Sequence, residues 1–427
     1  LAGWVEDPHR QVASIRALSV FGNPRAVHRA LHAVPRTSGG KPAPGGNSGT
    51  APPAVGFVSY VPGEPDPLPS LQHRIEIRLH CGNRIGIVPP LPPESFSAAR
   101  AAVLASVSSQ ALTRSIVEKC VGPAAASLHA HHLKRRRVLC TETFGSLPRR
   151  PSVSIVVPLC ADGSDLRFLV GALGTDPECR ECEAIFVLDG EAARGAAFDA
   201  LSALSQLHGL PARVIVLRES FGATAARNAG LAEANGRLVV FLGSGVVPVG
   251  AGWLGALRTA LRSRRGIGAV GARLLSADGA IDEAGTYFEA GALGRLHHHR
   301  AFRGWPRAFR PDTSPRPVPA VSADCLAVSR KIALEANGFV EDYLTDEAPG
   351  ADLCLRIRAL GREVAIAPAA ELYRLGGTQS VAADDVTRVA EEVDAWQFGR
   401  RWADQAVACT TKLARAGDAT ARALSST

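Results

Sequence analysis

The sequence contains no methionine and few aromatic residues. Met is absent from its 427 residues, although a chain of this length ordinarily contains several, and Phe, Tyr and Trp together make up 5%. Hydrophobic residues still reach 46%, as in a globular protein, so global disorder is excluded. The core must therefore be built mainly from Ala, Val and Leu, and the length indicates two or three domains.

Lysine is also scarce. It occupies only five of the 48 basic positions, the other 43 are Arg, and the net charge is +8. Arg favours bidentate contacts with phosphate or carboxylate, so nucleotide diphosphates, anionic lipid surfaces and nucleic acid all remain candidate partners at this stage. The basic run at residues 129–137 has no interleaved aromatic residue. We interpret it as a solvated helix face or linker, and we expect no nucleic-acid partner.

The nine cysteines are odd in number and scattered, several of them in apolar runs. This pattern is typical of reduced, buried cysteines in a cytosolic protein. Cys179 and Cys182 form a single CxxC without a second pair at zinc spacing, so we interpret it as structural. No signal-peptide pattern is present. Residues 238–257 are uncharged over the length of a membrane span, but five Gly and Pro248 within them favour a strand, a turn and a helix start.

Four regions follow along the chain. Residues 1–92 are predicted to form a β-rich, sandwich-like accessory domain, because apolar residues alternate in strand candidates at 15–21, 56–61, 73–80 and 84–88. A Gly/Pro/Ser stretch at 37–53 interrupts them. Residues 93–150 are predicted to be a helical connector with a helix at 95–120, and 381–427 a helical tail with an apolar stripe of Val386, Val389, Val393 and Trp396.

Strand and helix patterns alternate between residues 151 and 380. This order predicts an α/β fold with a doubly wound, mainly parallel sheet. Ligands of such sheets bind beyond the carboxyl ends of the strands. Those ends carry Pro158 and Leu159, Asp189, residues 218–221, and Gly243, Ser244 and Gly245.

Short motifs in this region share one order with a known family. They are VSIVVPL at 153–159, FVLDG at 186–190, GATAARNAG at 222–230, FLGSGVVP at 241–248, GWL at 252–254, GAVGARLL at 268–275, DLCLR at 352–356 and LY at 372–373. In this order they resemble family 2 glycosyltransferases with the GT-A fold, and the resemblance covers residues 151–380.

The resemblance implies a nucleotide-diphosphate-sugar ligand. It assigns donor binding to Pro158, Leu159, Asp189, Arg227, Asn228, Gly243, Ser244 and Gly245, with Asp189 reading the uracil ring. It assigns the acceptor or diphosphate to Arg303, Trp305 and Arg374, and catalysis to Asp352 as the base on the acceptor hydroxyl. The family usually stabilises the leaving diphosphate with Mn²⁺ or Mg²⁺ held by an Asp-x-Asp motif.

The sequence departs from the family at the positions that carry the chemistry. Gly243, Ser244 and Gly245 stand where the metal motif belongs, and glycine has no side chain to ligate a cation. Pro349 and Gly350 replace the Glu-Asp pair, and Arg374 replaces a His. In the most similar subfamily, a Gln-His pair lies where this chain has Asp282 and Glu283. We therefore expect no cofactor and no metal site.

Three interpretations follow. In the first, the chain is a pseudo-enzyme. In the second, it is a metal-independent transferase in which Arg374 or Arg218 faces the diphosphate and the base is Asp352, Asp346 or Glu347. In the third, it is a non-catalytic carbohydrate-binding or scaffold component of a glycan-assembly complex. By resemblance, the setting is the cytoplasmic assembly of a cell-surface polysaccharide, together with glycan-assembly proteins and with peripheral membrane contact.

Several of these residues also have a structural interpretation. Asp189 could be a turn residue, Arg227 and Asn228 could brace their helix, and Asp352 could pair with Arg356 one turn later. Adjacent side chains at His297, His298 and His299 would point in different directions, which favours a polar loop over a metal site. Residues 300–307 resemble an acceptor-side loop, in which aromatic rings stack on sugars and Arg binds phosphate, but they also fit a mobile surface loop.

Overall fold

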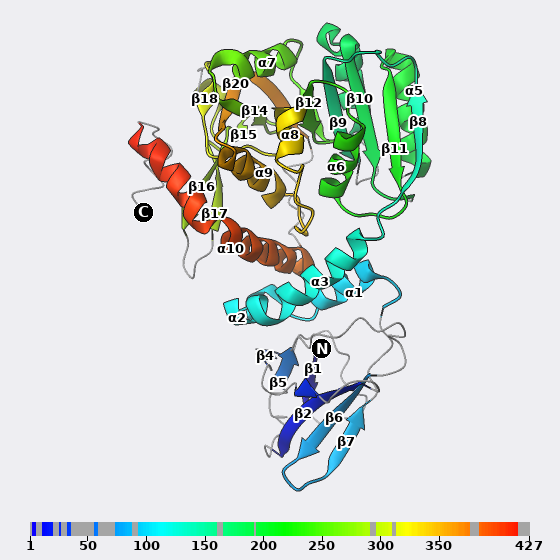
Figure 1. Cartoon of the computed structure of the whole chain (residues 1–427), viewed down its shortest axis with the longest axis vertical. Helices are drawn as coiled ribbons and strands as arrows, with labels where there is room; N and C mark the ends of the chain where they lie inside the picture. Colours follow the sequence, from blue (N-terminus) through cyan, green and yellow to red (C-terminus); the bar gives the residue numbers. More distant parts are fainter. Residues whose placement is uncertain are drawn as a thin grey trace. The chain divides into compact units, whose positions relative to one another are not determined.

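The computed structural model describes residues 2–5, 11–19, 25–26, 32–35, 55–58, 73–87, 93–159, 165–191, 194–290, 296–309, 313–375 and 384–416. The chain divides into two compact units, one of residues 1–134 with 382–396 and one of residues 135–381 with 397–427 (Figure 1). The domain boundaries expected from the sequence remain predictions.

The first unit contains two antiparallel sheets, with strand orders β3-β2-β6-β7 and β1-β5-β4. Their strands are β1 (Ala2–Val5), β2 (Val12–Ser19), β3 (Arg25–Ala26), β4 (His32–Pro35), β5 (Val55–Val58), β6 (His73–Leu79) and β7 (Arg84–Ile87). The alternation at 73–80 does form a strand, in which Ile75 and Ile77 lie opposite Ile87 and Ile85. A sandwich packing of the two sheets stays a prediction, and the Gly/Pro/Ser stretch at 37–53 lies outside the described residues.

The stretch at 95–120 is helical over most of its length, as the sequence predicted, but it is divided into several short elements. The elements are α1 (Phe96–Leu104), η2 (Ser109–Ala111), α2 (Arg114–Ile116), the π-helical η3 (Val117–Val121) and α3 (Gly122–Leu133). Ser106 donates its hydroxyl to the carbonyl of Val103 at 2.6 Å, and Thr113 caps the next helix by accepting from the Ile116 N–H at 3.3 Å. Ser and Thr side chains that bind nearby backbone compete with helix continuation.

The basic run at 129–137 is not a fully solvated face. His129 and His132 on α3 are only 3% and 2% exposed, and Arg100 of α1 contacts His129 Nδ1. Charge counting along the sequence overlooked that these histidines recur on the inner side of a helix. Beyond the helix, in the second unit, Arg135 and Arg136 form ion pairs with Glu219 and Glu341.

An eleven-stranded sheet organises the second unit, with the order β13-β20-β14-β19-β12-β9-β10-β11-β8 and with β15 and β18 attached to β14 and β20. The strands are β8 (Val138–Phe144), β9 (Val153–Leu159), β10 (Cys182–Leu188), β11 (Ala212–Leu217), β12 (Leu238–Leu242), β13 (Val246–Pro248), β14 (Ile267–Leu275), β15 (Ile281–Glu283), β18 (Arg316–Pro317), β19 (Cys325–Ser329) and β20 (Glu363–Arg374). The predicted α/β fold class, with its N-terminal β strands and C-terminal helix, is confirmed.

Four neighbouring strands, β12, β9, β10 and β11, run parallel, and their carboxyl ends therefore share one edge. Outside them, β19 and β8 pair antiparallel with β12 and β11. Every residue of β9 is buried, as a strand covered on both faces requires. Helices supply that cover: α4 (Leu166–Thr175), α5 (Arg194–His208), α6 (Ala223–Glu233), α7 (Trp253–Ser263), α8 (Arg330–Glu335) and α9 (Ala348–Ala359).

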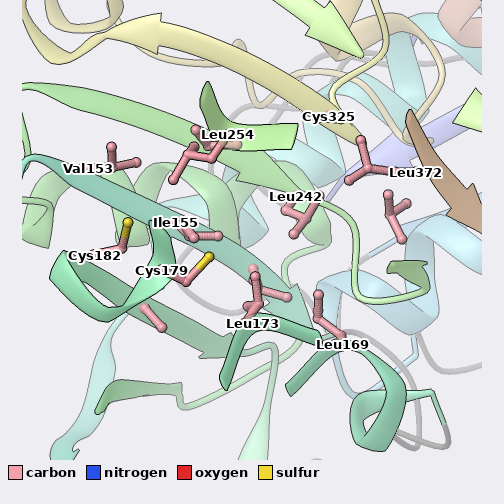
Figure 2. Packing of buried hydrophobic residues seen from close by; sticks show 14 of the residues in the cluster. Val153, Ile155, Leu169, Leu173, Cys179, Cys182, Leu242, Leu254, Cys325 and Leu372 are labelled. Atoms are coloured by element: carbon pink, nitrogen blue, oxygen red, sulfur yellow. The ribbon is translucent and has the colours of Figure 1, made fainter. Parts of the chain in front are cut away.

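The main core lies on one face of this sheet and is largely Val, Leu and Ala, as the scarcity of aromatic residues predicted. Val153 and Ile155 of β9 pack there with Leu169 and Leu173 of α4 and Leu254 of α7 (Figure 2). Cys179, Cys182 and Cys325 belong to the same cluster. The eight cysteines in the described part of the chain are all free, in agreement with reduced, mostly buried thiols.

The apolar stretch at 238–257 folds as predicted. It forms β12, a turn, β13 and the start of α7. Within the described residues, no helix has the length and apolar character that a membrane span needs.

The three adjacent histidines form a strand, so the predicted polar loop is wrong. β17 (Leu296–Arg300) pairs antiparallel with β16 (Thr286–Ala290). His298 packs against the rings of Phe288 and Phe398, with centroids 5.2 and 4.6 Å away. Phe398 lies on α10 (Asp385–Arg415), on which Val389 and Val393 of the predicted apolar stripe are buried. Neighbouring side chains of a strand point to opposite faces. His298 therefore contacts the aromatic rings, while the next residue, His299, lies with its Nε2 2.6 Å from Glu289.

Replacing Gly230 should measure how closely α6 approaches β9. A Cβ at this position would lie 2.3 Å from Val156 Cγ1, so Gly230→Ala should lower the free energy of unfolding by about 1–3 kcal/mol. The matched control is Gly195→Ala on α5, where a Cβ meets nothing within 4 Å and better helix propensity should add about 0.5–1 kcal/mol. Urea denaturation compares the two, and an unchanged Gly230→Ala would contradict the close packing.

His298 should make stability depend on pH. Desolvation lowers the pKa of His298 to about 4 from 6.5, so the folded state favours the neutral ring. Stability from this group is present above pH 6.5 and is lost as the pH falls towards 4, by roughly 1–3 kcal/mol in total. His298→Leu should flatten that part of the pH profile of unfolding, whereas His297→Leu, an exposed position on the same strand, should leave it unchanged. A profile that His298→Leu does not alter would show that the ring is hydrated.

Candidate functional site

Asp189 organises the carboxyl edge of the parallel strands. It follows β10, its N–H donates to the carbonyl of Leu159 at the end of β9 (3.0 Å), and its side chain is buried. Its carboxylate accepts hydrogen bonds from the Phe221 and Gly222 N–H groups and the Ser220 hydroxyl, at 2.7 to 2.8 Å. Gly222 is the N-cap residue of α6. Asp189 therefore fixes the loop after β11 against this edge, where Pro158 and Leu159 lie buried and Arg218 is exposed.

Arg227 and Asn228 of α6 have different surroundings. The Asn228 amide donates to the carbonyl of Phe339 and accepts from its N–H, both at 2.8 Å, and it also donates to Glu341 at 2.7 Å. Asn228 therefore braces its helix, as one of the two interpretations of the sequence held. Arg227 is only 2% exposed, and its guanidinium lies 3.4 Å from Asp324 Oδ1 and 3.3 Å from Asp346 Oδ1. Arg227 thus faces the strand edge, whereas Asn228 joins α6 to the loop before Glu341.

The turn of Gly243, Ser244 and Gly245 joins β12 to β13. Gly243 donates its N–H to the carbonyl of Asp324 at 3.0 Å, and Gly245 accepts from the N–H of Leu375 at 2.8 Å. A Cβ at position 243 would lie 3.0 Å from Asp324 Oδ1 and 3.1 Å from Val246 Cγ2. The turn is therefore fixed tightly beside Asp324, which precedes β19.

Arg374, the last residue of β20, binds three carboxylates. Its guanidinium lies 2.9 Å from Asp324 Oδ2 and 3.4 Å from Glu283 Oε2, and it also pairs with Asp282. Ser322 Oγ accepts a fourth bond at 3.1 Å. Desolvation by itself would lower the pKa of Arg374, but Asp324, Glu283 and Asp282 outweigh it and raise that pKa. The charge of Arg374 is thus already shared among neighbouring acids.

These residues do not fit a divalent cation. The turn at 243–245 offers no side-chain carboxylate, and Asp324 beside it is engaged by two guanidinium groups. Across the part of the chain that the structure describes, no group of three or more His, Cys, Asp or Glu side chains is arranged to hold a metal ion.

Asp352 is fully buried in α9 and bonded on both oxygens. It accepts from Trp402 Nε1 at 2.7 Å, from Tyr343 Oη at 3.0 Å and from Arg401 at 3.1 Å through Oδ1, and from Arg356 Nε at 2.7 Å through Oδ2. The pairing with Arg356 that the sequence indicated is present. Arg401 and Trp402 belong to α10, so Asp352 anchors that helix.

The position of the missing base motif has no room for a side chain. Gly350 lies in the first turn of α9, and a Cβ there would be 2.5 Å from the N–H nitrogen of Ala323 and 3.1 Å from the carbonyl of Val321. Among the acids that the sequence suggested as alternatives, Asp346 is 55% exposed in its side chain and Glu347 is 62% exposed. Desolvation, with Asp324 and Asp189 nearby, raises the pKa of Asp346, and Arg227 opposes the rise.

Arg303 and Trp305 lie on an ordered turn. The carbonyl of Trp305 accepts from Ile281 at 2.8 Å, and the N–H of Gly304 donates to Ile281 at 2.8 Å, so hydrogen bonds hold the turn along β15. Trp305 is 44% exposed, and Arg303 Nε lies 3.7 Å from Asp282. Phe302 has a left-handed φ of 61°, a conformation that non-glycine residues adopt at a cost and often near functional sites.

Sequence reasoning missed Asp324 and placed Arg300 on an acceptor-side loop at 300–307, whereas Arg300 ends the strand β17. Asp324 directly precedes an apolar strand, and its approach to this edge follows only if that strand runs antiparallel to β12. Arg300 of β17 lies 3.6 Å from Asp282 Oδ2 and 3.0 Å from Glu347 Oε1. Successive side chains of a strand point to opposite faces, so assigning the three histidines to a strand would also have placed Arg300 on it.

Replacing Asp352 by Asn should test its anchoring role. The variant removes the charge that Arg356, Arg401 and Trp402 share, so the free energy of unfolding should fall by about 3–5 kcal/mol. Thermal unfolding measures the loss. Asp342→Asn is the matched control, because Asp342 is 57% exposed and also pairs with Arg401; it should change stability by less than about 1 kcal/mol. Unchanged stability of Asp352→Asn would contradict the anchor.

Parts of the chain are similar to known proteins. Residues 154–332 match the family model "Glycosyl transferase family 2". The uncharacterized protein y4gI of Sinorhizobium fredii is 32% identical over 226 residues, which cover 52% of this chain. The chain spans 24% of the length of that relative.

Three solved structures are similar to the chain at low identity. GalNAc-T7 with UDP, GalNAc and Mn²⁺ has a TM-score of 0.43 and 17% identity, covering 57% of this chain and 48% of its own. The Pyrobaculum calidifontis mannosyltransferase PcManGT with GDP-Man and Mn²⁺ has a TM-score of 0.40 and 14% identity, covering 78% and 88%. S. aureus TarS 1–349 has a TM-score of 0.38 and 15% identity, covering 52% and 60%. Residues 154–332 are thus similar to glycosyltransferase family 2.

Proposed function

We propose that the domain binds a nucleotide-diphosphate sugar at the carboxyl edge of β9, β10, β11 and β12 without a divalent cation. The observation that carries this proposal is the turn of Gly243, Ser244 and Gly245 at that edge, beside an Asp324 that Arg374 and Arg227 already neutralise. The protein is then either a pseudo-enzyme or a metal-independent transferase. Its family suggests a place in cell-surface polysaccharide assembly at the cytoplasmic side of a membrane.

The nucleoside side of the pocket is proposed at Asp189, with Pro158, Leu159 and Arg227 around it. A carboxylate has about four acceptor sites, and Asp189 uses three of them within the described residues. The remaining site suits a ring N–H of a pyrimidine or purine base. Gly190, whose φ is 110° and whose Cβ position would be 3.2 Å from the Ser220 nitrogen, lets the two loops approach closely there. Asn228 would contribute only by bracing α6.

The diphosphate needs positive charge where a metal is lacking. Arg218 is exposed at the end of β11 and is the better candidate for direct contact. Arg374 is the second candidate, although its charge is shared by three carboxylates. Backbone N–H groups of the turn at Ser244 and Gly245 are the remaining groups for the sugar phosphate.

If the protein transfers a sugar, the proton of the acceptor hydroxyl needs a carboxylate that solvent and substrate can reach. Asp346 fits this role better than the buried Asp352, because solvent and substrate can reach its carboxylate, whose side chain is 55% exposed. Arg303 and Trp305 are proposed for the acceptor side, where the exposed indole could stack on a sugar ring.

The alternative function is that of a non-catalytic carbohydrate-binding or scaffold component of a glycan-assembly complex. The exposed Trp305 on a turn fixed by hydrogen bonds favours it, because such a platform can hold a glycan without any donor. In that case, the protein would bind its glycan without a nucleotide at the carboxyl edge.

Calorimetric titration with UDP and GDP, each with and without Mn²⁺, tests the proposal. We expect binding whose Kd changes less than threefold with Mn²⁺. Asp189→Asn should weaken binding at least tenfold, because a hydrogen bond to a charged group contributes about 1.5–3 kcal/mol. Asp278→Asn, an exposed turn residue that bonds only Ala280 in the described chain, is the control and should bind normally.

The opposite outcomes are equally informative. Binding that requires Mn²⁺ would refute the metal-free pocket. No binding of either nucleotide by the folded protein would remove the nucleotide-sugar proposal and favour the scaffold function.

A further inference from the structure

Three carboxylates from two segments converge on the guanidinium of Arg374. Asp282 and Glu283 are neighbours on β15, and Asp324 immediately precedes β19. The side chains of Asp282 and Glu283 are 8% and 4% exposed, and that of Arg374 is 10% exposed. The side chain of Asp324 is 32% exposed, so two buried carboxylates and one half-buried carboxylate surround one positive charge.

Other groups around this cluster compensate it only partly. Arg227 reaches the second oxygen of Asp324 at 3.4 Å, while Arg300 and Arg303 approach Asp282 at 3.6 and 3.7 Å. Glu283 is held from its other oxygen by Thr286 Oγ1 and the Ser322 N–H, both at 3.0 Å. Its Oε2 is thereby directed towards Arg374.

The guanidinium does not satisfy the site completely. The Nε–H group of Arg374 is buried and has no hydrogen-bond partner among the described residues, although NH1 and NH2 bind all three acids and Ser322. A planar fork of N–H donors suits one carboxylate in bidentate fashion, whereas here the acids lie around the end of the side chain. Oxygen ligands gathered around one centre are the environment that hard divalent cations prefer.

We propose that Arg374 acts as a built-in cation, which holds Asp282, Glu283 and Asp324 together and excludes divalent ions from the carboxyl edge. In the described structure the three acids are not arranged as a metal site, so uptake of Mn²⁺ requires them to close in on the space that the guanidinium occupies. Removing the guanidinium allows this, and the three carboxylates and the Ser322 hydroxyl then take up Mn²⁺. The inference goes beyond nucleotide binding and does not depend on it, because it concerns only the ion and these four side chains.

The test is titration of the full chain with Mn²⁺ alone, followed by electron paramagnetic resonance of the free ion. Wild-type protein should leave the free Mn²⁺ signal unchanged. Arg374→Ala should bind one Mn²⁺ with an affinity at least tenfold higher than wild type, in the range of about 0.1–1 mM typical of weakly organised oxygen sites. Mn²⁺ should also raise the Tm of this variant and not that of wild type.

Three matched variants separate this site from non-specific binding. Arg374→Lys keeps a positive charge and should bind no Mn²⁺. Arg374→Ala combined with Asp324→Asn should lose the binding. Arg213→Ala is the control for loss of an arginine, because Arg213 also bridges two acids, Glu183 and Glu233. Both oxygens of Glu183 already accept hydrogen bonds from Ser154 and Asn235, so the Arg213→Ala variant should bind no Mn²⁺.

Several results would overturn the proposal. These are equal Mn²⁺ binding by wild type and Arg374→Ala, no binding by folded Arg374→Ala, or binding that persists without Asp324. Should Arg374→Ala be insoluble, refolding with and without Mn²⁺ decides: recovery only with the ion supports the proposal, and equal failure contradicts it. A nucleotide titration of wild type reports separately on the proposed function.

Discussion

Charge compensation by arginine is the constraint on which the carboxyl edge depends. Buried carboxylates are costly unless each is paired and hydrogen-bonded, and here Arg374 provides the pairing for the buried Asp282 and Glu283. Arg374 and Arg227 also pair with the more exposed Asp324. The same solution recurs away from the edge, where Arg356 and Arg401 meet the fully buried Asp352. Some of the 43 Arg therefore serve internal ion pairs, while the net charge of +8 comes from basic residues in excess of the acids.

This constraint shapes the chemistry that the domain can perform. A cation held by acids can be exchanged, whereas a guanidinium on β20 is permanent and cannot be deprotonated. The edge therefore has a fixed positive centre whose field is partly cancelled by its own acids. A phosphate approaching the edge would gain less electrostatic stabilisation from Arg374 than from an exposed residue such as Arg218. The rate of any transfer would then depend on how the nucleotide sugar is bound and on the position of Asp346.

Part of this arrangement followed from the sequence. Apolar strand patterns ending in Asp189 and Gly243 predicted the parallel core and the edge, because period and turn residues are local properties. The remainder depends on partners that are distant in the chain. Asp352 is fixed by Trp402, fifty positions later, and Asp324 reaches the edge only because β19 runs antiparallel to β12. A local pattern carries neither contact.

Anomalous diffraction at the manganese edge, from crystals soaked in Mn²⁺, tests the central claim most directly. Wild-type crystals should show no anomalous peak near Arg374, and crystals of Arg374→Ala should show one peak among Asp282, Glu283 and Asp324. A peak beside the turn of Gly243 and Gly245 in the wild-type protein would contradict the claim that arginine, and not a metal, neutralises this edge.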